Sequence, residues 1–244
     1  MLITYIHHSC FSVELDDTIL LFDYYKGILP TFNKQKQLYV FASHKHHDHF
    51  DLCIFDLAKE YPNITYILSK DIKMNDSYLE RNNIPLQLKD NIIYVGKNET
   101  LQPIPSSNFV PIKIETLTST DEGVAFIITH QNNVIYHAGD LNFWTWPGEA
   151  EEEYHDMEAR FVREMEKLEG RSIQIAFVPL DPRQEDRFYW GFDYFMKYSN
   201  TLSVFPMHFW NDYTVIPRLK ALNCSKDYLD KIMDITQEGQ EFVM

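Results

Sequence analysis

Short apolar runs, separated by turn-like polar residues, recur along most of the chain and predict strands in both halves. The expected strands span residues 2–6, 11–15, 18–23, 38–42, 64–68, 92–95, 110–117, 124–129, 134–137, 173–178 and 202–205. Longer segments with helical spacing and end signals predict helices over residues 52–60, 72–81, 149–168, 192–198, 216–222 and 226–229. Strands that dominate both halves, with helices interspersed, favour two packed sheets with helices outside, a four-layer α/β/β/α sandwich.

Length and composition are typical of a globular chain with a full core. The 244 residues are 45% hydrophobic, and we expect one domain over residues 1–244. The sequence has no run of about 18 consecutive apolar residues, so we expect no transmembrane helix. Residues 1–6 have the pattern of a first strand rather than a signal peptide. The three widely spaced cysteines do not suggest disulfides or a cysteine-based zinc site, so we expect a reducing, cytoplasmic location.

The charge of the chain restricts the classes of molecule that we expect it to bind. It has 22 basic and 36 acidic residues, for a net charge of −14, and such a surface repels polyphosphate. We therefore expect a small-molecule substrate rather than a nucleic acid or a membrane. The sequence leaves open whether the protein forms a homo-oligomer.

The densest chemical signal is a histidine cluster at residues 44–49, just after the predicted strand 38–42. Alternate side chains of an extended segment share a face, so His44, His46 and Asp48 can point to one side. His49 joins them if the chain turns there. Because neutral imidazoles and carboxylates are the usual ligands of zinc and similar ions, the cluster predicts a metal site.

Three other strand ends carry polar groups that could complete a site. Asp140 follows one predicted strand, Asp181 and Arg183 follow another, and His208 follows a third. Polar groups at the ends of buried strands are a common way to build a site on a rigid scaffold. Asp181 and Arg183 have two interpretations, a structural ion pair or groups that face the site.

These motifs together resemble a known family. Residues 44–49 match the H-x-H-x-D-H signature of the metallo-β-lactamase fold superfamily, and residues 137–140 and 206–208 are similar to its later aspartate and histidine motifs, in the same order. Residues 5–11 and 136–140 are similar to the branch that includes L-ascorbate-6-phosphate lactonase. The resemblance implies the αββα fold and a metal-dependent hydrolase.

The resemblance also implies how two metal ions would share the ligands: His44 and His46 for the first, Asp48, His49 and His208 for the second, and Asp140 bridging both. Asp48 would ligate or orient a hydroxide, and His208 would lie near the leaving group, so these two are the candidate catalytic residues. Zinc is the expected metal, as one or two ions, with Mn²⁺ or Fe²⁺ as alternatives because His/Asp sites accept them.

One feature departs from the family pattern. The family usually supplies a third histidine to the first metal, between the signature and the aspartate motif at residues 137–140, but the only histidine between these two motifs is His130, at the far end of a predicted strand. Asp121 or the Ser119 hydroxyl, in the loop at residues 117–123, could take its place, as could water. A single metal ion in the second site is the alternative.

Two further residues have alternative roles. His8, in the turn after the first strand, could contact the substrate or be structural. Asp23, at the end of the third strand, could hydrogen-bond a ligand histidine and so hold its tautomer, or could simply form a turn.

The leading functional hypothesis is a zinc-dependent hydrolase that opens a small ester, lactone or phosphodiester by metal-activated water. A nuclease or phosphodiesterase of the same fold is an alternative that the negative charge disfavours. A metal-binding or sensing protein that has lost catalysis is the alternative from another class.

Overall fold

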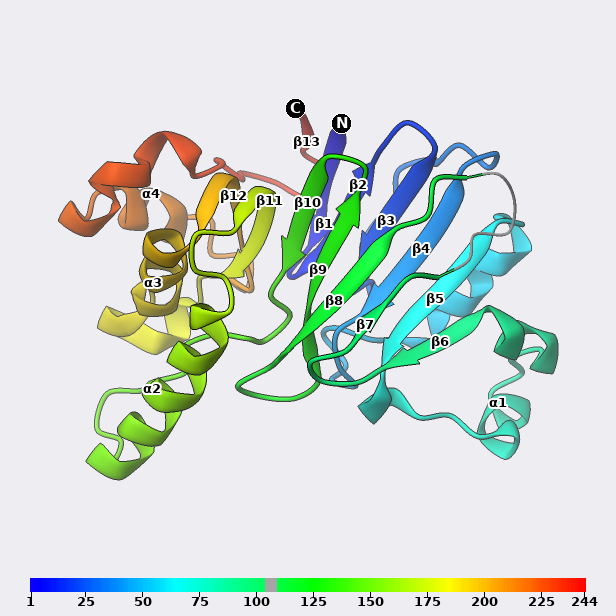
Figure 1. Cartoon of the computed structure of the whole chain (residues 1–244), viewed down its shortest axis with the longest axis horizontal. Helices are drawn as coiled ribbons and strands as arrows, with labels where there is room; N and C mark the ends of the chain where they lie inside the picture. Colours follow the sequence, from blue (N-terminus) through cyan, green and yellow to red (C-terminus); the bar gives the residue numbers. More distant parts are fainter. Residues whose placement is uncertain (104–108) are drawn as a thin grey trace.

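The computed structural model describes residues 1–103 and 109–244. Two sheets pack against each other, and helices cover the outer faces (Figure 1), so the predicted four-layer sandwich is confirmed. Helices α2 (Glu151–Glu166), α3 (Trp190–Tyr198) and α4 (Val215–Lys220) lie together beside strands β11 (Ser172–Pro179) and β12 (Asn200–Met207). Helix α1 (Asp76–Arg81) lies on the opposite side, beside strands β5 (Ile64–Ser69) and β6 (Ile92–Val95). No helix in the described part of the chain is both long enough and apolar enough to cross a bilayer.

One sheet has seven strands in the order β13-β1-β2-β3-β4-β5-β6, in which β3 to β6 are parallel. Its strands are β1 (Leu2–His7), β2 (Cys10–Glu14), β3 (Thr18–Phe22), β4 (Gln37–Ala42), β5 (Ile64–Ser69), β6 (Ile92–Val95) and β13 (Glu241–Val243).

The other sheet has six strands in the order β12-β11-β10-β9-β8-β7, in which β10 to β12 are parallel. Its strands are β7 (Thr100–Leu101), β8 (Lys113–Thr118), β9 (Val124–His130), β10 (Asn133–His137), β11 (Ser172–Pro179) and β12 (Asn200–Met207). The α-helices are α1 (Asp76–Arg81), α2 (Glu151–Glu166), α3 (Trp190–Tyr198) and α4 (Val215–Lys220).

Strand β4 illustrates why the apolar runs become central strands. Tyr39 and Phe41 face the core between the two sheets, whereas Leu38 and Val40 face a second core under the helical segments beside that sheet. A strand that is buried on both faces must be apolar at nearly every position, as this one is. The same strand carries the histidine cluster to the edge of the sheet.

Several elements differ from their predicted form. The segment Leu52–Lys59 is a 3-10 helix rather than an α-helix, although Asp51 caps it by accepting from the backbone N–H of Cys53. Helix α1 begins at Asp76, and β8 begins at Lys113, later than predicted. Strand β7 was not predicted, because a two-residue edge strand has no periodicity and forms only by pairing with β8.

Candidate metal centre

The candidate site residues follow the carboxyl ends of strands that point to the same edge of their sheets. These residues are His8 after β1, Asp23 after β3, 44–49 after β4, Asp121 after β8, Asp140 after β10, Asp181 after β11 and His208 after β12. Ligands commonly bind outside the carboxyl ends of strands in α/β sheets. The topology therefore brings together residues that lie up to 200 positions apart in the sequence.

The histidine cluster itself is not extended. Ladder pairing of β4 ends near Ala42, and the chain then turns, with the His46 carbonyl accepting hydrogen bonds from the backbone N–H groups of His49 and Phe50 at 3.0 and 2.9 Å. The expected extended conformation of this segment is therefore wrong. His44 and His46 still meet, with Nε2 and Nδ1 3.0 Å apart, whereas Asp48 lies in a different group of side chains.

Ligand-type side chains gather in two groups, each with its donor atoms within 4.8 Å of one another. The first group is His44, His46, Asp121 and Asp140, and the second group is His8, Asp48, His49 and His208.

In the first group, His44 Nε2 lies 3.0 Å from His46 Nδ1 and 3.5 Å from Asp140 Oδ2. Asp121 Oδ2 lies 3.6 Å from His46 Nδ1, so this carboxylate occupies the neighbourhood where a third histidine was missing. His130 is remote from the group, at the other end of β9, where it lies 3.0 Å from Asp17.

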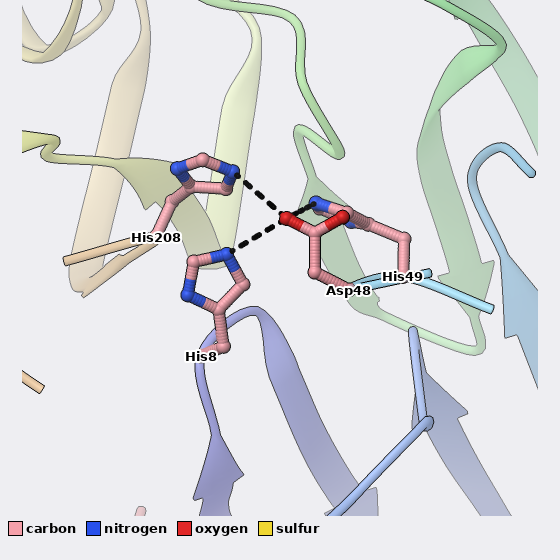
Figure 2. A group of neighbouring side chains, drawn as sticks. All are labelled: His8, Asp48, His49 and His208. Atoms are coloured by element: carbon pink, nitrogen blue, oxygen red, sulfur yellow. Dashed lines mark ion pairs between the residues drawn. The ribbon is translucent and has the colours of Figure 1, made fainter. Parts of the chain in front are cut away.

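In the second group, three imidazoles surround one carboxylate (Figure 2). Asp48 Oδ2 lies 3.5 Å from His8 Nε2, 3.9 Å from His208 Nε2 and 4.0 Å from His49 Nε2. Asp140 connects this group to the first, because its Oδ1 lies 3.2 Å from His49 Nε2 and 3.4 Å from His208 Nε2. The two oxygens of Asp140 thus face different groups.

Two buried carboxylates stand behind histidines of the second group. Asp23 Oδ2 lies 2.7 Å from His49 Nδ1, and Asp23 also accepts hydrogen bonds from the backbone N–H and hydroxyl of Ser43, both at 2.7 Å. Asp181 Oδ2 lies 2.9 Å from His208 Nδ1. Contacts of this kind fix the tautomer and the orientation of an imidazole, leaving Nε2 to face the site.

The backbone is strained at three of these positions. His8, Asp23 and His208 have φ values of 53°, 46° and 62°, in the left-handed region that residues other than glycine rarely adopt. Such conformations cost about 1–3 kcal/mol each and cluster at functional sites. His8 and His208 belong to the second group, and Asp23 lies behind His49 of that group.

Two glycines let the loops of the two sheets approach. A Cβ on Gly139 (φ 51°) would lie 2.7 Å from Ser43 Cβ, and a Cβ on Gly123 (φ 68°) would lie 1.9 Å from the Ser43 carbonyl oxygen. Both positions also need a positive φ, which glycine adopts without steric cost. Ser43, and with it His44, is therefore held between two loops of the other sheet.

Three buried polar atoms of the site, His8 Nε2, His49 Nε2 and Asp140 Oδ1, have no hydrogen-bond partner among the described residues. Buried polar atoms are almost always satisfied, so unpartnered ones call for an explanation. All three belong to the two groups, and a cation between them would satisfy them. The mixture of imidazole nitrogens and carboxylate oxygens suits zinc, manganese or iron.

The protonation of His8 and His44 agrees with this interpretation. Burial lowers the pKa of His8 and that of His44 to about 4, so both imidazoles are neutral at pH 7, the form that binds a metal. Burial raises the pKa of Asp140, but the surrounding imidazoles outweigh burial and bring it well below its ordinary value. For Asp121 the balance is reversed, since burial and the neighbouring Asp140 raise its pKa.

A cavity of about 550 Å³ opens onto both groups. It is lined by His46, His47, Asp48, Thr120, Asp121, Asp140, Trp144, Trp146, Met157, Arg183, His208 and Trp210, which include three of the four tryptophans of the chain. His47 is exposed at the rim and belongs to neither group.

The sequence does not mark His8 as a metal ligand, although the structure puts it in the second group. A histidine in a turn between two buried strands is a candidate ligand by residue type and position, but the adjacent His7 meets the same description. His7 lies 2.5 Å from Glu238 instead, near the end of the chain. Only the left-handed backbone at His8, which the sequence does not reveal, separates the two.

Comparisons with known proteins agree with this fold. Residues 2–157, well over half of the chain, match the family model described as "Beta-lactamase superfamily domain". A UPF0173 metal-dependent hydrolase of Bacillus cereus strain B4264 is 25% identical over 97% of this chain and 100% of its own length. Its name agrees with the sequence-based prediction of a metal-dependent hydrolase.

Two solved structures show the same fold at low sequence identity. Igni18, a metallo hydrolase from Ignicoccus hospitalis, has a TM-score of 0.59 at 17% identity and covers 100% of this chain and 98% of its own. YhfI, a metallo-beta-lactamase fold protein from Bacillus subtilis, has a TM-score of 0.60 at 12% identity and covers 99% and 98%. The motifs, the two-sheet architecture and the family match lead to one conclusion: this chain belongs to the beta-lactamase superfamily domain family.

Proposed function

We propose that this protein is a metal-dependent hydrolase whose two groups hold two divalent ions, with zinc as the first candidate and Mn²⁺ or Fe²⁺ as alternatives. The first group would hold one ion, the second group the other, and Asp140 would reach both. The observation that carries this proposal is the pair of groups joined through the two oxygens of Asp140, with buried, unpartnered atoms facing inward.

Zinc held by these residues would lower the pKa of a water bound to it to near 7 and would polarise the bond that is to be cleaved. Residues of the chain would act on the water and on the leaving oxygen. Asp48 lines the cavity, and its contacts with the imidazoles of His8, 3.5 Å away, and His49 outweigh burial and keep its pKa below the ordinary value. Asp48 is therefore ionised and can orient a water or accept its proton. His208 lines the same cavity, held by Asp181, and would stand near the leaving oxygen.

The cavity and the charge of the chain support a small substrate. A volume of about 550 Å³ suits a molecule of modest size. The net charge of −14 makes nucleic acid a poor partner. We therefore propose a small ester, lactone or phosphodiester as the substrate, in agreement with the hydrolase names of the relatives.

The test is turnover of a lactone and of bis-p-nitrophenyl phosphate by the zinc-loaded protein, its Asp48→Asn and Asp140→Ala variants, and a His155→Gln control. His155 lies exposed on α2, outside both groups, so its variant should match the wild type. We expect each aspartate variant to lose at least about 100-fold in kcat while it remains folded, because each alters the ligands of the ions that activate water.

Near-normal turnover by both aspartate variants would contradict the proposal. Metal analysis on the same samples separates the alternatives. Two ions per chain with turnover support the hydrolase, whereas bound metal without turnover of either substrate would favour a metal-binding or sensing protein.

A further inference from the structure

Arg183 is the single arginine or lysine among the described residues that line the cavity. It follows β11, in the 3-10 turn Pro182–Arg187, and about half of its side chain is exposed. The other ionisable groups on the cavity wall are histidines and the carboxylates Asp48, Asp121 and Asp140.

The guanidinium of Arg183 is held in one orientation. Its Nε lies 3.0 and 2.9 Å from the two carboxylate oxygens of Asp181, and its Nη2 also donates to that carboxylate. The Trp210 ring lies beneath it, 4.7 Å from the ring centroid to Cζ. Both partners are themselves tied to the site, since Asp181 contacts His208 and Trp210 packs against His8.

One edge of the guanidinium remains available. Among the described residues, none accepts a hydrogen bond from Arg183 Nη1, and no described residue other than Asp181 forms an ion pair with this side chain. Arginine presents a planar fork that matches carboxylate and phosphate oxygens, and its binding cost is low where the fork is already fixed. A residue with only a structural role would not need to leave half of its side chain in the cavity wall.

The charges in the cavity leave room for an anion. Three carboxylates, Asp48, Asp121 and Asp140, together with one hydroxide, would balance the four positive charges of two divalent ions. Asp181 is buried and already shared with His208, so Arg183 is the remaining positive group that a substrate can reach. Trp144 and Trp146 line the cavity as well, with their rings stacked at 6.2 Å, and provide an apolar wall.

We propose that the substrate is a small anion with a carboxylate or phosphate that pairs with Nη1 of Arg183 and an apolar or ring-containing body that packs against the tryptophans. This inference rests on the proposed hydrolase and names the class of molecule that the hydrolase takes. Arg183 is then a specificity residue, which binds a part of the substrate away from the bond that is cleaved.

A pair of esters that differ only in charge tests the proposal. The zinc-loaded protein is assayed with 4-nitrophenyl hydrogen glutarate, which ends in a carboxylate, and with its neutral terminal amide. The wild type should have the lower KM for the anionic ester. Arg183→Met should raise that KM roughly 10-fold or more, the effect of one lost charge-assisted hydrogen bond, with little change in kcat or in either constant for the neutral ester.

Two further variants separate specificity from structure. Arg183→Lys retains the charge and should restore part of the preference for the anion. Arg187→Met is the matched control: Arg187 lies in the same turn, but its guanidinium packs on Trp190 and pairs with Glu149, away from the cavity. Equal losses on both esters in Arg183→Met, in kcat rather than KM, would mean that Arg183 acts only through Asp181 and His208, and would overturn the proposal.

Binding provides a readout that does not depend on turnover. Isothermal titration with glutaranilate and with its neutral terminal amide should show preferential binding of the anion by the wild type, lost in Arg183→Met and retained in Arg187→Met. If neither ester is hydrolysed but this pattern appears, the hydrolase proposal fails and the anion site stands. Equal binding of both compounds by the wild type, or no binding of either, overturns the anion site.

Discussion

In the second group all four side chains are buried, whereas in the first group His46 and Asp121 leave 41% and 45% of their side chains exposed. The support behind the two groups also differs. Buried carboxylates back two imidazoles of the second group, at 2.7 and 2.9 Å. In the first group, the Ser43 hydroxyl lies 3.0 Å from His44 Nδ1, and within the described part of the chain His46 Nδ1 has only His44 Nε2, also at 3.0 Å, as a hydrogen-bond partner.

If the two groups hold two ions, as proposed, this difference predicts that the two ions bind with unequal affinity. A ligand that is already fixed in place loses little freedom when a metal binds, and a carboxylate behind an imidazole makes it a better donor. We therefore expect the second group to bind its ion more tightly than the first. The missing third histidine affects the weaker half, where Asp121 is the substitute that lies within reach.

The largest expected difference between the two groups is in the free energy of unfolding after one histidine is removed from each. His49 lies between two buried carboxylates, Asp23 and Asp140, and its removal leaves both without that partner. His49→Ala should cost roughly 3–5 kcal/mol in free energy of unfolding, the usual result of breaking a buried charged pair. His46→Ala, at a half-exposed position, should cost much less. Urea unfolding of both variants in a chelator measures the difference, and similar losses would show that the groups are equally supported.

A milder change leaves the ligands in place and removes only their support. Asp23→Asn and Asp181→Asn each weaken the partner of one imidazole of the second group, so each should lower the affinity for one of the two ions about 10–100-fold. Competition with a chromophoric chelator gives both dissociation constants. Asp23→Asn also disturbs the first group, because Asp23 holds the Ser43 hydroxyl that backs His44. For Asp181→Asn the other ion should be unaffected, and a loss spread evenly over the two ions in that variant would contradict the separation of the groups.

The smallest effect is a difference in pH dependence. Burial and the neighbouring Asp140 raise the pKa of Asp121, whereas the pKa of Asp140 and that of Asp48 lie below their ordinary values. As pH falls, protons therefore compete for Asp121 before they compete for Asp140 or Asp48. Metal content after dialysis over a pH series should show one ion released at higher pH than the other. Asp121→Asn should remove the step at higher pH.

Much of this molecule could be predicted because its signals are local. The apolar runs around β4 and β11 predict buried strands, since a strand covered on both faces has few polar positions. The histidine cluster and the Gly139-Asp140 turn are each short and lie at strand ends. Their order along the chain was enough to indicate the fold and a metal site.

Other features depend on contacts between distant segments. Nothing near His8 in the sequence distinguishes it from His7, and only the packing of β1 against the other strands brings it within 3.5 Å of Asp48. The cluster at residues 44–49 was expected to be extended, but the chain loses its ladder partners after Ala42 and turns. Neither outcome follows from residue type or spacing.

By itself, then, the sequence determined the two-sheet fold, the family and a set of imidazoles and carboxylates suited to divalent ions, because periodicity and short motifs act over neighbouring residues. The tertiary structure alone decided how those ligands divide into two groups, that Asp121 rather than His130 stands beside His46, and that Arg183 faces the cavity. The physical reason is that a metal site is made of strand ends from both sheets, and their meeting is set by the packing of the whole core.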